Sequence, residues 1–374
     1  MRSVLNEILT LRSRKAPVID YSNRNRYCVI ALEDNGTKTA YFFSTPIYNK
    51  KSKKLVDLKF YENEKTWQAY GSNTAVSISD KVCLENEDGC FEIIFPGNLI
   101  NTSETSVRYE NAEIVPSLNG ILVKAACTKH QPYEIRLVSE QPFIPVRANE
   151  RCFSLMKEEF KPFITLSCIG VLNSAGQMIA PCAIEYQKPS DKEYAIILQH
   201  GSPYGVTLLF EINLHEEKLF QDTTVESLHP DVNNAFGGTA FIGKTTSYGE
   251  QWLYSRPDFS KLSNLYDKQV HKAAIHIPKF GGSCALTAFG LPTRFCSFGS
   301  KWENKVQTSE EITDTVQFDK YQSLDITKLL TDRAGFLKPS EGFVLKPKVN
   351  SCGFSAVSTG DSCFAPQILE INFR

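Results

Sequence analysis

The chain has 374 residues, of which 42% are hydrophobic and 22% are charged, and its formal net charge is -1. This near-neutral balance argues against an extended nucleic-acid-binding face, which needs a clustered excess of lysine and arginine. No segment approaches the ~20 consecutive apolar residues that cross a bilayer, so we expect no membrane span.

The N-terminal segment, residues 1–20, predicts one short amphipathic helix. Its apolar residues share one helical face: Val4, Leu5, Ile8, Leu9 and Leu11. The segment has no continuous apolar stretch and no small-residue cleavage site, so we expect no signal peptide. The apolar face makes this helix a candidate docking element for protein partners.

From residue 21 onward, apolar residues recur with a period of two, which indicates strands. Asn35-Gly36 predicts the turn between "CVIAL" and "KTAYFF". The basic run "KKSKK" at 50–54 lies between two apolar stretches and indicates a hairpin tip rather than a phosphate clamp. In "VTLLFEINL", alternation points Thr207, Glu211 and Asn213 outward. The residues expected to point inward are Val206, Leu208, Phe210, Ile212 and Leu214.

Many short strands separated by turns predict an all-β fold of tandem β-sandwich or jelly-roll domains, with a short N-terminal helix. Breaks in the strand rhythm lie near 139–152 and 219–231. We therefore expect a helix in 1–20, a β-sandwich in 21–140, a β-rich middle segment in 141–218 that could pack with the first domain, and a β-sandwich in 219–374.

The eleven cysteines are an odd number, so at least one is unpaired in a monomer. They are scattered, with no C-x-x-C pair, and we expect neither a zinc site nor any other metal site. Most lie in apolar, strand-like surroundings, which favours a reduced interior.

The segment "GGTAFIGKTTSYGEQW" (237–252) contains a P-loop pattern, with Gly238, four residues and then Gly243-Lys244-Thr245. A working P-loop follows a buried strand and opens a helix. Here "SLHPDVNNAF" precedes the pattern, and strand-forming residues follow it. We interpret the segment as part of a β-sandwich, with positive φ at Gly237 and Gly238 and an exposed Lys244, and we expect no nucleotide or other cofactor.

No other catalytic pattern stands out. The six histidines match no metal-ligand pattern, there is no G-x-S-x-G elbow, and His276 in "AAIHIP" reads as a hydrogen-bonded strand residue. Sequence-adjacent carboxylates point to opposite faces of a strand and cannot form an acid/base pair. We identify no catalytic residue and expect a protein that is not an enzyme.

From about residue 219 onward, the order of features resembles the DNRLRE domain, a β-sandwich module of bacterial surface and secreted proteins. The matching segments, in order, are "QDTTVESLHPDVNNAFGGTAFIG", "WLYSRPDFSKL", "VHKAAIHI", "KWENK", "SLDITKLL", "GFVLKPK" and "PQILEINF". The R-F-D triad of the family is partly kept in Arg256-Pro257-Asp258-Phe259. Residues 21–218, with "YFFSTPIYN" and "GSNTAVSIS", are similar to β-rich segments of bacterial surface or Rhs-type proteins.

The resemblance implies a non-catalytic binding or display protein of bacterial surface or secreted type, with a carbohydrate-binding-like C-terminal module and polysaccharide as partner. An extracellular setting fits poorly with the missing signal peptide and the odd cysteine count. Sugar binding needs exposed aromatic rings bordered by polar groups. The candidate ligand-binding residues are Trp302, Asn304, Trp252, Tyr254 and Arg256.

Two other functions stay open on the sequence. One is a structural or assembly protein of a virion, appendage or surface layer, in which the sandwiches make protein contacts. The other is a polysaccharide-active enzyme, which would need a cleft with clustered ionisable residues.

Overall fold

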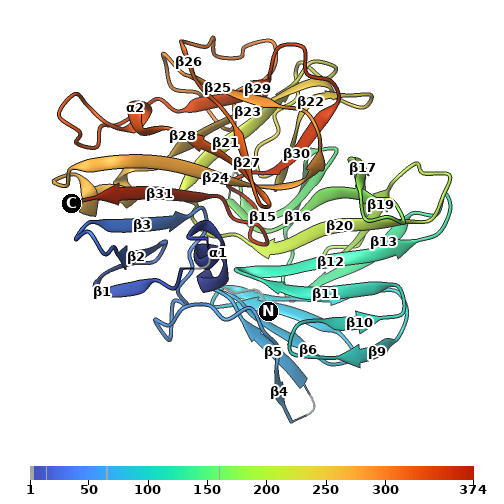
Figure 1. The fold of residues 1–374 in the computed structure, drawn as a ribbon. Helices are drawn as coiled ribbons and strands as arrows, with labels where there is room; N and C mark the ends of the chain where they lie inside the picture. Colours follow the sequence, from blue (N-terminus) through green and yellow to red (C-terminus); the bar gives the residue numbers. More distant parts are fainter. Residues whose placement is uncertain (1–3, 14, 65, 160) are drawn as a thin grey trace. The chain divides into compact units, whose positions relative to one another are not determined.

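The computed structural model describes residues 4–13, 15–64, 66–159 and 161–374. It confirms the all-β prediction, with three antiparallel sheets in a sandwich-like arrangement and a short N-terminal helix (Figure 1). The described helices are α1 (Val4–Leu11), the 3-10 helix η1 (Phe259–Leu265) and α2 (Thr327–Leu330). None of them has the length and apolarity needed to cross a membrane.

The chain forms two compact units. Unit 1 comprises residues 47–216, and unit 2 comprises residues 5–46 together with 217–374.

Unit 1 is a sandwich of two sheets. One sheet contains, in spatial order, β14 (Ile144–Asn149), β15 (Cys152–Glu158), β16 (Lys161–Leu172), β20 (Val206–Leu214), β12 (Gly120–Cys127), β11 (Ala112–Ser117), β10 (Val107–Tyr109) and β9 (Leu99–Thr102), with β17 (Met178–Ala180) paired to β16. The other contains β18 (Ala183–Ser190), β19 (Glu193–Gln199), β13 (Tyr133–Ser139), β8 (Gly89–Ile94), β7 (Val82–Asn86), β6 (Ala75–Ile78), β5 (Thr66–Tyr70) and β4 (Tyr61–Asn63).

The two sheets of unit 1 share one hydrophobic core. Phe91 and Ile93 of β8 enter it from one sheet, and Phe210 and Ile212 of β20 enter it from the other. The five predicted inward residues of "VTLLFEINL" are all buried there, which confirms the alternation. Glu211 and Asn213 lie outside this core, as the alternation predicts, but they are buried rather than exposed, and the Asn213 amide donates to the Glu211 carboxylate at 2.9 Å.

Unit 2 contains a single fourteen-stranded sheet. Its main path is β1 (Val18–Asn25), β2 (Cys28–Leu32), β3 (Lys38–Phe43), β31 (Ile368–Phe373), β24 (Val270–Gly282), β30 (Phe354–Ser358), β22 (Thr239–Thr245), β23 (Gly249–Pro257), β29 (Phe343–Pro347), β25 (Leu286–Gly290) and β26 (Glu311–Asp314). Beside this path, β21 (Phe220–Glu226) pairs with β23, and β27 (Val316–Phe318) pairs with β28 (Tyr321–Asp325), which pairs with β24.

The long strand β24 joins the two halves of this sheet. Its first part pairs with β28 and β31, and its end pairs with β30 from Lys279 to Gly282, with a bulge between Lys279 and Gly281. A bulge bends a strand, so one strand can serve two faces of a sandwich. Residues of both halves, such as Ala40 of β3 and Leu253 of β23, meet in one core.

The first strands belong with the last strand of the chain. β3 pairs with β31 from Lys38↔Phe373 to Phe43↔Ile368. The sequence-based division grouped residues 21–46 with the segment up to 140, whereas this ladder places β1 to β3 in unit 2. Local alternation reveals a strand but carries no information about a partner more than 300 residues away.

The P-loop-like segment is a β-hairpin. Gly243-Lys244-Thr245 ends β22, and β23 follows from Gly249, with Thr245 opposite Gly249. Lys244 is exposed, as expected. The positive φ of this segment was predicted at Gly237 and Gly238, but Gly243 and Gly249 hold it, with φ of 121° and 67°.

The cysteines differ from the expected reduced interior in two places. The structure pairs Cys83 with Cys90, on the neighbouring strands β7 and β8, and it pairs Cys168 with Cys182. The other seven cysteines form no disulfide, and five of these are buried. No group of three or more potential metal-binding side chains occurs among the residues that the structure describes.

A substitution at Gly243 tests how closely β22 approaches the start of β30. A Cβ at Gly243 would meet the Gly353 carbonyl oxygen inside van der Waals contact and would need φ of 121°, whereas Gly36 has φ of 80° and open space around it. We expect Gly243→Ala to lower the free energy of unfolding by about 3 kcal/mol or more, because strain and overpacking add. Gly36→Ala should cost about 1 kcal/mol. Urea unfolding measures both, and equal losses would contradict this packing.

Candidate functional site

The structure brings two of the five predicted site residues together. Trp252 lies on β23 and Trp302 on the loop between β25 and β26, and their ring centroids are 4.9 Å apart. Tyr254 lies two residues along β23, but its side chain is fully buried and its hydroxyl donates to the Val306 carbonyl oxygen at 2.8 Å. Tyr254 therefore supports this surface from inside the core.

Asn304 and Arg256 are the other two predicted site residues. The Asn304 amide closes its own turn, accepting from the Lys301 backbone N–H at 2.7 Å and donating to the Gly299 carbonyl oxygen at 3.0 Å. Burial lowers the pKa of the half-buried Arg256, and the nearby positive charge of Arg294 lowers it further.

Lysine side chains cover the tryptophan rings. Lys346 Nζ lies 3.8 Å from the Trp252 ring centroid, and Lys305 Nζ lies 4.3 Å from that of Trp302. These are cation–π distances. The rings are half-buried, so they differ from a bare aromatic platform.

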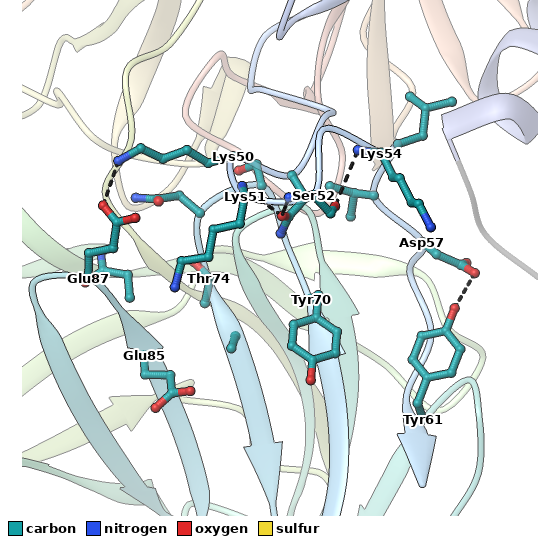
Figure 2. Close-up of a pocket in the computed structure, with 17 residues that line it drawn as sticks. Lys50, Lys51, Ser52, Lys54, Asp57, Tyr61, Tyr70, Thr74, Glu85 and Glu87 are labelled. Atoms are coloured by element: carbon teal, nitrogen blue, oxygen red, sulfur yellow. Dashed lines mark hydrogen bonds and ion pairs between the residues drawn. The ribbon is translucent and has the colours of Figure 1, made fainter. Parts of the chain in front are cut away.

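A pocket in unit 1 offers a more open site (Figure 2). Its volume is about 730 Å³, within the usual range for small-ligand sites. The lining residues come from the basic turn, from the loop between β5 and β6, and from strands β4 to β7 with the turn that follows β7. They are Asn49, Lys50, Lys51, Ser52, Lys54, Leu55, Val56, Asp57, Tyr61, Tyr70, Ser72, Asn73, Thr74, Ala75, Glu85, Asn86 and Glu87.

The basic run forms a tight hairpin tip, as predicted, and this tip is the roof of the pocket in Figure 2. Tyr48 and Leu55 pair across its base. The Asn49 carboxamide oxygen accepts from the backbone N–H of Lys51 and Ser52 at 3.1 and 2.9 Å, an Asx turn. Its amide group donates to the Gly71 carbonyl oxygen at 2.8 Å, which fixes the tip to the loop between β5 and β6.

Asn119 holds the floor of the pocket. Its side-chain oxygen accepts from Ser72 Oγ, the Asn73 backbone N–H and Thr74 Oγ1 at 3.3, 3.2 and 2.6 Å. Its amide donates to the Leu214 carbonyl oxygen at 2.5 Å, and the side chain is fully buried. One asparagine thus fixes three consecutive floor residues.

Two tyrosine rings stand open on the outer face of the sheet. Tyr70 and Tyr61 are 50% and 46% exposed, and Figure 2 shows both below the basic turn. Tyr70 of β5 pairs with Ala75 of β6, which pairs with Glu85 of β7. Because Ala75 is small, the space between the Tyr70 ring and the Glu85 carboxylate stays open.

Opposite charges balance within the pocket. Lys50 pairs with Glu87 at 2.9 Å and holds the pKa of that carboxyl below its ordinary value. Tyr61 donates to Asp57 at 2.6 Å, and this bond raises the pKa of Tyr61 to about 12. The pocket therefore presents donors and acceptors of both signs.

One triad-like contact lies in unit 2. His276 Nδ1 is 2.8 Å from Ser323 Oγ, and its Nε2 is 2.9 Å from Glu370 Oε2. The three residues sit on β24, β28 and β31. β24 and β28 are each paired on both sides, so their backbone N–H groups serve the ladders rather than an oxyanion hole. The prediction of His276 as a hydrogen-bonded strand residue is confirmed.

The pocket of unit 1 was not predicted from the sequence. Its parts span residues 49–87 and reach Asn119, and no short motif joins them. The available signal was Tyr70 in an outward-facing strand position followed by "GSNT", a turn rich in small polar residues. The role of Asn119 depends on pairing between distant segments.

Comparison with known proteins does not place this chain in a family. No family model matches it, and no curated protein matches it. A solved structure, the Paenibacillus xanthan lyase, aligns at 10% identity over 98% of this chain and 40% of its own length, with a TM-score of 0.17. Likeness at this level supports no conclusion about fold or function.

The Asn119 network predicts a large local effect on stability. We expect Asn119→Ala to lower the free energy of unfolding by about 3 kcal/mol, because buried partners lose their acceptor. Asn98 is exposed and makes one side-chain bond, to Glu110 at 2.9 Å. Asn98→Ala should therefore change stability by less than about 0.5 kcal/mol. Urea unfolding of the two variants checks the difference, and a neutral Asn119→Ala would contradict the assigned role.

Proposed function

We propose that this chain is a non-catalytic carbohydrate-binding protein and that the pocket of unit 1 is its binding site. The observation that carries this proposal is the pair of exposed rings, Tyr61 and Tyr70, inside a pocket lined by amides, hydroxyls and charged groups. Aromatic rings offer apolar area to the C–H face of a pyranose. Polar side chains around a pocket fix a ligand's orientation.

The size and charge of the pocket favour a short oligosaccharide segment. A cavity of about 730 Å³ has room for more than one sugar ring. The basic turn supplies ammonium donors from above, and Glu85 is an exposed acceptor on the strand side. Because acids and bases balance, the pocket suits the hydroxyls of a neutral glycan better than a highly charged polymer.

The carboxyls of the pocket do not suggest hydrolysis. A glycosidase needs one carboxyl with a raised pKa as general acid beside a second carboxylate. Glu87 has its pKa lowered by Lys50, and Asp57 accepts a hydrogen bond from Tyr61. This supports a binding role over a polysaccharide-active enzyme.

No observation favours the assembly alternative in the same way. Ile8 of α1 has no exposed surface, and Arg12 pairs with Glu33 inside unit 2 at 2.5 Å. Of the predicted docking face, Val4 and Ile8 are buried within the chain, whereas Leu5 is exposed and Leu9 and Leu11 are half-buried, so the docking role of α1 stays a prediction. The DNRLRE resemblance supports carbohydrate display by the C-terminal part and stays a prediction.

A glycan screen with matched tyrosine variants tests the proposal. We expect the full chain to bind at least one neutral oligosaccharide, and Tyr70→Ala to weaken that binding by roughly tenfold, since a stacked ring contributes about 1–2 kcal/mol. Tyr204 is 76% exposed in the same unit but outside the pocket, so Tyr204→Ala should bind as the unaltered chain does.

Two results would overturn the proposal. One is the absence of binding to every neutral glycan by a chain shown to be folded. The other is an equal loss in both tyrosine variants, which would place the binding outside the pocket. Release of reducing ends from a bound polysaccharide would contradict the non-catalytic assignment alone.

A further inference from the structure

Unit 2 carries a second cluster of aromatic and cationic side chains, which we call the tryptophan–lysine cluster: Trp252, Phe289, Trp302, Lys305 and Lys346. Its members come from β23, β25, β29 and the loop that follows β25. They lie beside the small core formed by Val225, Tyr254, Leu291, Phe295 and Val344. The cluster therefore stands on a packed support.

The two ammonium groups share the ring system. Lys346 Nζ is 3.8 Å from the Trp252 centroid and 5.1 Å from the Phe289 centroid. Lys305 Nζ is 4.3 Å from the Trp302 centroid and 5.6 Å from the Trp252 centroid. All four distances fall within the ~6 Å reach of a cation–π contact.

No carboxylate neutralises these two lysines by an ion pair within the described ranges of the chain. Lys346 donates to Thr308 Oγ1 at 3.3 Å and Lys305 to the Trp302 carbonyl oxygen at 3.1 Å. Each ammonium has three donors, so each keeps capacity for a ligand. The nearest acid, Glu250, accepts from Trp252 Nε1 at 2.7 Å.

The positive charge of Lys346 is partly desolvated, and a bound anion would stabilise it. Burial lowers the pKa of Lys346, the charge of Glu250 offsets this in part, and the charge of Lys305 lowers the pKa further, so that the net direction is downward. A carboxylate beside both ammonium groups would restore the balance, and charge-assisted hydrogen bonds of this kind are about twice as strong as neutral ones.

We propose that the tryptophan–lysine cluster is a second glycan site, distinct from the unit 1 pocket, which binds a carboxylate-bearing polysaccharide such as a polyuronate. The ammonium groups of Lys305 and Lys346 take the carboxylates, and the tryptophan rings beneath hold these ammonium groups in place. The proposal rests on the cluster's own contacts and stands independently of the pocket.

A polyuronate fits the cluster better than a nucleic acid. Nucleic-acid binding relies on many lysine or arginine contacts along a phosphate backbone. The cluster has two unpaired ammonium groups beside Glu250, and the whole chain has a net charge of -1. A polyuronate carries separate carboxylates along a sugar chain, and these suit the two ammonium groups that lie over the two indole rings.

The test uses the full chain and three probes: polygalacturonate, dextran of similar mass, and an oligothymidylate. We expect polygalacturonate to bind more tightly than dextran, to shift tryptophan fluorescence, and to weaken as salt rises. Lys346→Met and Lys305→Met should each reduce its affinity by roughly tenfold. Methionine keeps an apolar stem over the rings, and thermal unfolding verifies the fold of each variant.

The control is Lys338→Met, which removes the same charge from an exposed lysine after α2. It should leave polygalacturonate binding within a factor of about two, as expected for a screened charge. Tyr70→Ala should also leave it unchanged, which separates this site from the pocket. No binding of polygalacturonate, an equal loss in Lys338→Met, or equally tight oligothymidylate binding would overturn the proposal.

Discussion

The hydrogen bonds of the Asn119 side chain fix the loop on which the whole pocket of unit 1 depends. Its oxygen takes donors from Ser72, Asn73 and Thr74, and its amide group binds the end of β20. The loop can lie this close because Gly71 has no Cβ, which would stand 2.5 Å from the Leu118 carbonyl oxygen. Once the loop is fixed, Asn49 and the Lys50 backbone N–H attach the basic turn to it.

In this pocket, the residues that hold the shape differ from the residues that would contact a ligand. The bonds that set the pocket's shape come from backbone groups and buried amides, while the exposed side chains around it keep free surface. Tyr70 bonds only sideways, to Gln68 at 2.7 Å, so its ring face is available. The tryptophan–lysine cluster of unit 2 is built differently, since its rings are already covered by cations, and this difference is why the two sites suit glycans of different charge.

The sequence predicted what depends on local pattern. Alternation identified the core residues of β20, and context showed that Gly243-Lys244-Thr245 belongs to a strand. It failed where contacts between distant segments decide: the ladder between β3 and β31 moves residues 18–43 into unit 2, and Glu211 is buried despite its charge. Among the candidate site residues, Trp252 and Trp302 do meet, but Tyr254 lies in the core because alternation alone does not say which face of a strand is covered.

The most direct measurement of the account is NMR of ring-labelled tyrosine in the full chain, with Tyr61→Phe and Tyr70→Phe assigning two of its fifteen tyrosines. Neutral hexasaccharides of glucose, mannose and xylose serve as probes. We predict that a bound probe shifts the Tyr61 and Tyr70 ring signals and leaves Tyr204 unmoved. Binding that moves other rings, while Tyr61 and Tyr70 stay fixed, would contradict the central claim that the unit 1 pocket is the carbohydrate site.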